Sequence, residues 1–422
     1  MMQQRTLTKQ SPIFMVLSIN AIVLLTVLIN VAFKIIEFHG FILSVNSLLC
    51  PFFSMLYLAV LRCCTWQEQR HLLHIALIAL YTFCIGIYLL INLPAAEYMH
   101  DNPVYQIVFD DIPRKFFAIT VGFALSFYLP HFLFCSQQRS LTTNPKFCLL
   151  LALLGGIVFY IITFLFLFSG TRIPKLEQIC IDSSLVAAFV LLSSSAFYLM
   201  TLLYRENASA KARIGSPISF PYYLICFALV VILICLACEY RIIALGQTWI
   251  LAASSLFFPL TLIISTIIGE LLGYRINFQL SLLLSATQIL FDLLLMALVA
   301  LPSPDFYNLN PFYSYIMVRR LPADSLTLLV TFISNAFLLH QLKQMKVKRS
   351  LRIIIANMCA NSLLCLIDYS LLFGGIYSYE QIMHLVLNVW EYKTVVALIS
   401  VPIIIKICNS LERKNSLSLQ YT

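Results

Sequence analysis

The stretch FCLLLALLGGIVFYIITFLFLFS (147–169) contains no charged side chain and is long enough to cross a bilayer as one helix. A helix needs about 20 apolar residues to span about 30 Å of hydrocarbon. Similar runs, separated by short polar breaks, recur along the chain. Hydrophobic residues make up 61% of the 422 residues and charged residues 11%, whereas soluble domains carry about 25% charged residues. The sequence therefore predicts a protein whose excess apolar surface faces lipid.

The pattern of these runs predicts an all-α integral membrane protein with about twelve transmembrane helices. Only helices and closed barrels satisfy every backbone amide in hydrocarbon, and the runs do not alternate in polarity as barrel strands do. The first run is too long for the apolar region of a cleaved signal, so we expect it to remain as an anchor. The predicted spans are residues 14–36, 41–62, 72–94, 115–136, 147–169, 179–204, 219–239, 248–270, 278–301, 323–342, 351–374 and 383–407.

The basic residues indicate how the chain is oriented. With the N-terminus inside, the predicted cytoplasmic segments hold 18 Lys and Arg residues and the opposite side holds 8, among them Arg319 and Arg320. This asymmetry favours both termini in the cytoplasm, and we expect a multi-pass protein of the plasma membrane, the inner membrane of a bacterium. The net charge of +9 is not gathered in one patch, so it does not indicate a nucleic-acid partner.

The chain repeats itself at a spacing of about 208 residues. FKIIEFHGFILSVNSLLCPFFSMLY (33–57) aligns with YRIIALGQTWILAASSLFFPLTLII (240–264), which pairs Lys34 with Arg241 and Pro51 with Pro259. We predict a first six-span repeat at 1–206, a cytoplasmic linker at 207–218 and a second six-span repeat at 219–422. An even number of spans gives both repeats the same orientation, so they form two parallel six-helix repeats with a substrate cleft expected between them.

Ionisable and polar groups at membrane depth are costly and usually mark a pathway or a site. Most of them lie in the second repeat. Asp368 and Lys393 could instead form a structural ion pair between two helices, Glu270 could be an interfacial residue near Arg275, and the asparagines could be interhelical hydrogen-bonding groups. Together with Arg114 of the first repeat, the candidate substrate-binding residues are Glu270, Gln288, Asp292, Asn335, Asn361, Asp368 and Lys393.

Four segments of the second repeat carry a resemblance to a known family. They are FPLTLIISTIIGELLGYR (258–275), VTFISNAFLLHQLK (330–343), ANSLLCLIDYSLLF (360–373) and WEYKTVVALISVP (390–402). Over residues 219–410 the chain resembles the queuosine precursor transporters, also called the VUT family, with Glu270, Asp368 and Lys393 at matching places. The sequence departs from the family at Cys365 and at Ala323. The first repeat lacks the acid and the lysine but keeps Pro113-Arg114.

The resemblance implies a transporter that imports a queuosine precursor, a 7-deazapurine base or similar molecule, by alternating access. We expect the chain to work as a fused pseudo-dimer, monomeric, with the small-molecule substrate and the lipid bilayer as its partners. One carboxylate, of Asp368 or Glu270, can accept the N1–H and 2-amino group of a deazaguanine, and Lys393 or an asparagine can donate to its carbonyl. Phe291, Tyr369 and Trp390 could stack on the ring, or could equally face lipid or pack between helices.

Three alternatives remain at this point: another small-molecule secondary transporter, a degenerate family member that only binds or scaffolds, and a membrane-embedded enzyme that modifies a lipid. The enzyme would need a nucleophile and base or a metal cluster at one depth. His131 and His340 fall at equivalent positions but have no recognisable ligand set around them. We therefore predict no enzymatic activity, no catalytic residues, no metal and no cofactor.

Overall fold

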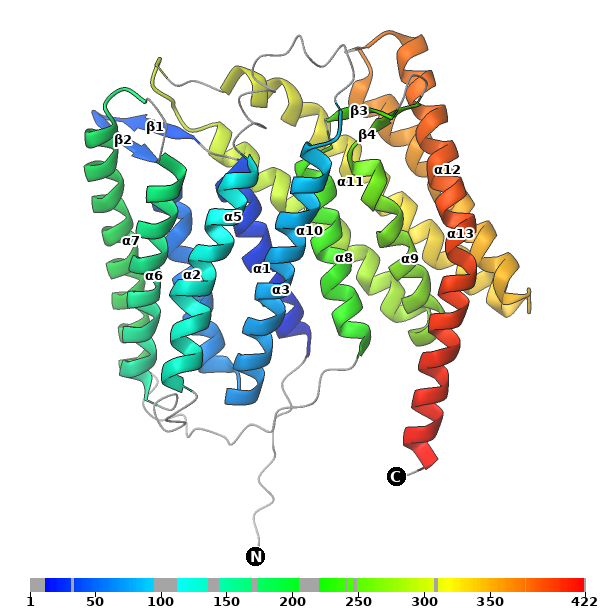
Figure 1. The fold of residues 1–422 in the computed structure, drawn as a ribbon, viewed down its shortest axis with the longest axis horizontal. Helices are drawn as coiled ribbons and strands as arrows, with labels where there is room; N and C mark the ends of the chain where they lie inside the picture. The colour runs from blue at the N-terminus through cyan, green and yellow to red at the C-terminus, as the bar shows by residue number, and fades with distance from the viewer. Residues whose placement is uncertain are drawn as a thin grey trace, which may run out of the picture. The chain divides into compact units, whose positions relative to one another are not determined.

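The computed structural model describes residues 12–31, 34–94, 112–135, 144–168, 173–204, 220–239, 241–245, 249–306, 310–375 and 377–420, and Figure 1 shows their helices and strands. Among these residues, eleven helices are long and apolar enough to cross a membrane, and Phe14–Asn30 forms a shorter apolar helix. The chain is thus an all-α integral membrane protein, as predicted. The predicted linker at 207–218 lies outside the described residues.

The chain divides into two compact units. Unit 1 comprises residues 1–85, 107–226 and 297–311, and unit 2 comprises residues 86–106, 227–296 and 312–422. The predicted repeats, 1–206 and 219–422, are each continuous in sequence, whereas each unit combines three segments of the chain. The repeats remain a prediction.

Unit 1 is built on helices α1 (Pro12–Val31), α2 (Asn46–Cys63), α3 (Trp66–Ile91), α5 (Ile112–Phe123), α6 (Pro145–Phe168) and α7 (Leu176–Tyr204). Two π-helical turns, Ala124–Tyr128 and His131–Cys135, follow α5. Helix α2 packs against α6 and α7. Gly156 permits the close approach of α6 to α2, because a Cβ atom there would lie 2.9 Å from the Cβ of Ser54.

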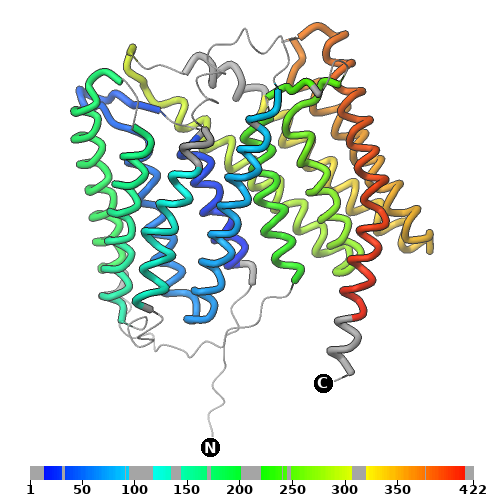
Figure 2. Tube along the Cα trace, in the orientation of Figure 1, coloured from blue at the N-terminus to red at the C-terminus, as the bar shows by residue number. Residues whose placement is uncertain are grey.

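Unit 2 contains helices α8 (Phe220–Ala237), α9 (Ser254–Leu272), α10 (Tyr274–Val299), α11 (Asn310–Gln344), α12 (Arg349–Phe373) and α13 (Tyr379–Gln420), apart from the ends of α8, α10 and α11 that belong to unit 1. Helices α12 and α13 pack side by side, as Figure 2 shows, and α9 packs against α13. Helix α11 continues through Pro322. The helix thus begins before the predicted span 323–342, and Arg320 lies within it with 4% of its surface exposed.

Two β-hairpins precede α2 and α9. In the first, β1 (Ile35–Phe38) pairs with β2 (Phe41–Ser44), and in the second, β3 (Ile242–Leu245) pairs with β4 (Trp249–Ala252). The predicted starts of two spans at 41 and 248 were therefore wrong. His39 and Gly40 have φ values of 49° and 85°, and positive φ at both central residues is the geometry of a two-residue hairpin turn.

Each hairpin is preceded by a basic residue that donates hydrogen bonds to backbone carbonyl oxygens. Lys34 donates hydrogen bonds to the carbonyl oxygens of Val299 (2.7 Å) and Leu301 in unit 1, and Arg241 donates to the carbonyl oxygen of Leu93 (2.8 Å) in unit 2. These donors and acceptors are separated by about the spacing of the sequence repeat. The correspondence agrees with an internal duplication, which remains a prediction.

Candidate functional site

Unit 2 encloses a small cavity whose walls carry four ionisable groups. We call it the charged cavity; it measures about 20 Å³, room for a single water molecule. Five helices build it together with Glu239, which lies two residues beyond the end of α8. Its lining is Ile232, Cys235, Leu236, Glu239, Ser254, Phe258, Asp324, Leu328, Leu364, Asp368, Tyr369 and Lys393. Charged side chains enclosed at membrane depth are rare and usually functional, which makes this cavity the candidate site.

Asp368 on α12 and Lys393 on α13 face this cavity without a direct ion pair between them. Lys393 is 1% exposed, and its Nζ atom lies over the rings of Phe258 (4.7 Å) and Tyr369 (5.4 Å). Within the described part of the chain, neither the ammonium nor the Asp368 carboxylate has a hydrogen-bonding partner. A simple structural ion pair is therefore not what these two residues form.

Behind Asp368, three further carboxyl groups surround the Arg320 guanidinium. Its Nε atom lies 3.4 Å from Glu239, 3.2 Å from Asp292 and 3.3 Å from Asp324. We call these four residues the Arg320 cluster. Gln288 donates a hydrogen bond to Asp292, so the predicted Gln288–Asp292 pair joins this cluster.

The Arg320 cluster and the charged cavity are continuous. Carboxylate oxygens of Glu239, Asp324 and Asp368 all lie within 4.8 Å of one another, close enough to share protons or to bind one cation. Burial raises the pKa of the Glu239 carboxyl above its ordinary value, and the Arg320 guanidinium opposes that rise. The acids thus outnumber the bases in a region that excludes bulk water.

A second polar network lies outside this cavity. Glu270 forms ion pairs with Arg349 (3.0 Å) and Arg352. Asn335 donates to Asn357 (2.9 Å), as expected of an interhelical hydrogen bond. Neither Glu270 nor Asn335 lines the charged cavity.

The remaining predicted residues divide between the cavity and its surroundings. Asn361 donates to the backbone carbonyl of Lys393 (3.3 Å), and the side chain of Arg114 lies outside the described residues. Of the predicted aromatic residues, Tyr369 lines the cavity, whereas Phe291 packs on Arg320 (5.3 Å) and Trp390 is 37% exposed.

Three site residues were not predicted: Glu239, Arg320 and Asp324. Glu239 is the last residue of a predicted span, and Arg320 was placed between spans, on the side opposite the cytoplasm. The pair Arg320–Asp324 has the i,i+4 spacing of an ion pair on one helix face, and that spacing was the available signal.

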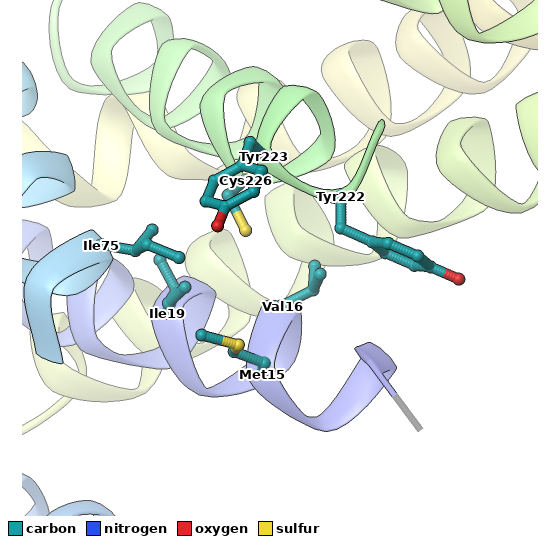
Figure 3. A pocket seen from close by; sticks show the side chains of 7 residues that line it. All are labelled: Met15, Val16, Ile19, Ile75, Tyr222, Tyr223 and Cys226. Atoms are coloured by element: carbon teal, nitrogen blue, oxygen red, sulfur yellow. The ribbon is translucent and has the colours of Figure 1, made fainter. Parts of the chain in front are cut away.

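Unit 1 has a cavity of a different kind. Figure 3 shows it between α1, α3 and α8, lined by Met15, Val16, Ile19, Ile75, Tyr222, Tyr223 and Cys226, with Tyr222 directed away from the other side chains. It measures about 10 Å³ and is lined mainly by apolar atoms. It carries no ionisable pair comparable to Asp368 and Lys393.

The two histidines considered for an enzyme are separately engaged. His131 is hydrogen-bonded to the Tyr57 hydroxyl (3.0 Å), and His340 stacks on Tyr274 with ring centroids 5.0 Å apart. Among the described residues, neither belongs to a group of side chains that could ligate a metal.

Comparison with known proteins finds one family model, which matches the part of the chain that supplies most of the charged cavity but not its α8 side or Glu239. Residues 252–407 match the family model described as "putative vitamin uptake transporter". The matched region holds Asp292, Arg320, Asp324, Asp368 and Lys393, and it confirms the predicted family resemblance over these residues. No curated protein and no solved structure matches the chain.

Proposed function

We propose that the chain is a transporter that imports a queuosine precursor, a 7-deazapurine base or a closely similar molecule, by alternating access. The observation that carries this proposal is the buried pair of Asp368 and Lys393, whose charged groups have no hydrogen-bonding partner among the described residues. It lies within the region similar to vitamin uptake transporters. An acceptor and a donor held in one cavity suit a ligand that presents donors and an acceptor of its own.

A deazaguanine ring offers this complement. Its N1–H and 2-amino group lie side by side, and the Asp368 carboxylate can accept both as charge-assisted hydrogen bonds. The Lys393 ammonium can donate to the ring carbonyl. Phe258 and Tyr369, whose rings already flank Lys393, offer flat faces for stacking, which is worth about 1–3 kcal/mol per base in other proteins.

The size of the cavity supports a conformational cycle. A volume of about 20 Å³ holds one water but not a bicyclic base, so substrate binding requires α9, α12 and α13 to separate around the site. Opening to one side of the membrane at a time is the alternating access of secondary transporters. In this proposal the chain lies in a bacterial inner membrane with both termini in the cytoplasm and acts as a monomeric, fused pseudo-dimer.

The experiment is uptake into cells that cannot synthesise queuosine. Cells expressing the chain receive each precursor in turn, and queuosine in their tRNA is measured by mass spectrometry. We expect modified tRNA with at least one 7-deazapurine base in cells that carry the chain, and none in cells with an empty vector. An unmodified tRNA pool with every precursor, while the protein is shown to be in the membrane, would refute the proposal.

A matched pair of variants assigns the uptake to the site. Asp368→Asn should remove it, whereas Asp305→Asn, the same change at an exposed position, should leave it intact. Equal uptake by both variants would place the substrate elsewhere.

A further inference from the structure

The Arg320 cluster holds more acid than base. Glu239, Asp292 and Asp324 surround a single guanidinium, and Asp368 and Lys393 add one charge of each sign beside it. With every group ionised, these six side chains would carry a formal charge of −2. Asp292 and Asp324 are nearly inaccessible to solvent, with 0% and 2% of their surface exposed.

An uncompensated charge of this size is unfavourable in a buried site, so the cluster must bind positive charge. Carboxylate oxygens of the cluster can accept this positive charge. Both carboxylate oxygens of Asp324 and Oε2 of Glu239 accept no hydrogen bond from described residues, and of these Asp324 Oδ2 and Glu239 Oε2 lie at ion-pair distance from Arg320. Both side chains line the charged cavity. Burial also raises the pKa of the Glu239 carboxyl, which favours its protonated form.

We propose that Glu239 and Asp324 form a proton-binding site that couples substrate uptake to proton influx. This inference rests on the proposed function. A proton taken up from the outer side binds a carboxylate of this pair, makes it a neutral carboxylic acid, and leaves on the inner side after the substrate has crossed.

The geometry links the proton to the substrate through Asp368. A like charge within a few ångströms disfavours ionisation, and the Asp368 carboxylate lies within 4.8 Å of both Glu239 and Asp324. Protonation of the pair therefore favours the ionised form of Asp368, which is the form that accepts two hydrogen bonds from the base. Proton and substrate then bind cooperatively, and the coupling is reciprocal.

The groups that face the pair favour a proton over a metal ion. Helix α10 presents Asp292 and α11 presents Arg320, α12 and α13 present Asp368 and Lys393, and α8 and α9 add Cys235 and Ser254. Carboxylate oxygens also bind hard cations, but the Arg320 guanidinium and the Lys393 ammonium beside these carboxyl groups repel a metal ion. A shared proton needs only the two carboxyl groups.

The test uses the purified full chain in proteoliposomes, with radiolabelled 7-deazaguanine outside and a pH-sensitive dye trapped inside. We expect uptake to acidify the interior. With the membrane potential clamped at zero, an exterior more acidic by one pH unit should raise the final accumulation about tenfold, because one proton per substrate couples the two concentration ratios. A protonophore should abolish the increase.

Variants identify the site. In Glu239→Gln and Asp324→Asn we expect the ratio of accumulation with and without the pH gradient to fall from about ten to about one, whereas the exposed Glu391→Gln should keep the wild-type ratio. If neither variant folds, the effect of the pH gradient on accumulation by the wild-type chain tests the inference. Uptake by the wild-type chain that ignores the pH gradient, or that follows a sodium gradient, would overturn the inference and leave the proposed function standing. No uptake of any precursor would overturn both.

Discussion

Replacing Asp368 with Asn tests whether its carboxylate binds the substrate or stabilises the fold. The substitution keeps the size of the side chain and removes its charge. In the proposed complex the carboxylate accepts two charge-assisted hydrogen bonds, each worth about 1.5–3 kcal/mol, and the amide can accept only one, of neutral strength. A loss of about 2–4 kcal/mol corresponds to roughly 30- to 1,000-fold lower uptake efficiency, at about 1.4 kcal/mol per tenfold change.

The same change should lower uptake without lowering the stability of the folded protein. Asp368 forms no direct ion pair with the residues that the structure describes, and carboxylate oxygens of Glu239 and Asp324 lie within 4.8 Å of it. Two ionised groups at that distance repel each other by about 3 kcal/mol at an effective dielectric constant of about 20. Asn therefore relieves repulsion, and we expect the detergent-solubilised protein to unfold at the wild-type temperature or higher.

The assay pairs initial uptake rates at several substrate concentrations with thermal unfolding of the same preparations. Asp305→Asn serves as the exposed control and should match the wild type in both measurements. Breaking a buried ion pair costs about 3–5 kcal/mol. An Asp368→Asn protein that unfolds well below the wild type, or that is lost from the membrane, would show that Asp368 holds helices together and would refute this reasoning.

Other substitutions test separate parts of the account. Lys393→Met should raise the apparent KM for the base roughly 10- to 150-fold through the loss of one charged hydrogen bond of about 1.5–3 kcal/mol; an unchanged KM in the uptake assay would remove Lys393 from the site. Glu270→Gln breaks the ion pairs with Arg349 and Arg352 and should lower the free energy of unfolding by about 2 kcal/mol. This is less than the cost of breaking a fully buried ion pair because the arginines are partly exposed. The KM should remain at the wild-type value. Lys34→Met removes the hydrogen bonds to the carbonyl oxygens of Val299 and Leu301, at and just beyond the end of α10, so it should lower the unfolding temperature. If amide hydrogen exchange at the β1–β2 hairpin is the same in the variant and the wild type, this prediction is contradicted.

A simple physical rule selected from the sequence two residues that line the charged cavity. Asp368 and Lys393 lie inside long apolar runs, where an ionisable group is too costly to keep without a role. The same rule overlooked Arg320, because this residue was placed outside the predicted span 323–342, whereas α11 continues through Pro322. A prediction of span ends from sequence cannot decide whether neighbouring helices support a proline within a helix.

Depth in the membrane was equally hard to predict from sequence. Glu270 and Asp368 were both candidates for the same role, but the end of α9 places Glu270 beside Arg349 and Arg352. The hairpins were missed because their strands are apolar and merge with the spans that follow, as in FILS (41–44) and WILA (249–252). Short apolar strands and helix ends have the same composition, so periodicity does not distinguish them.

The most direct test of the central claim is the accumulation of labelled 7-deazaguanine in proteoliposomes that contain only the purified chain. The account predicts saturable uptake that unlabelled base abolishes, and loss of that uptake in Asp368→Asn but not in Asp305→Asn. Vesicles with correctly inserted wild-type protein that accumulate no more base than protein-free vesicles would contradict it.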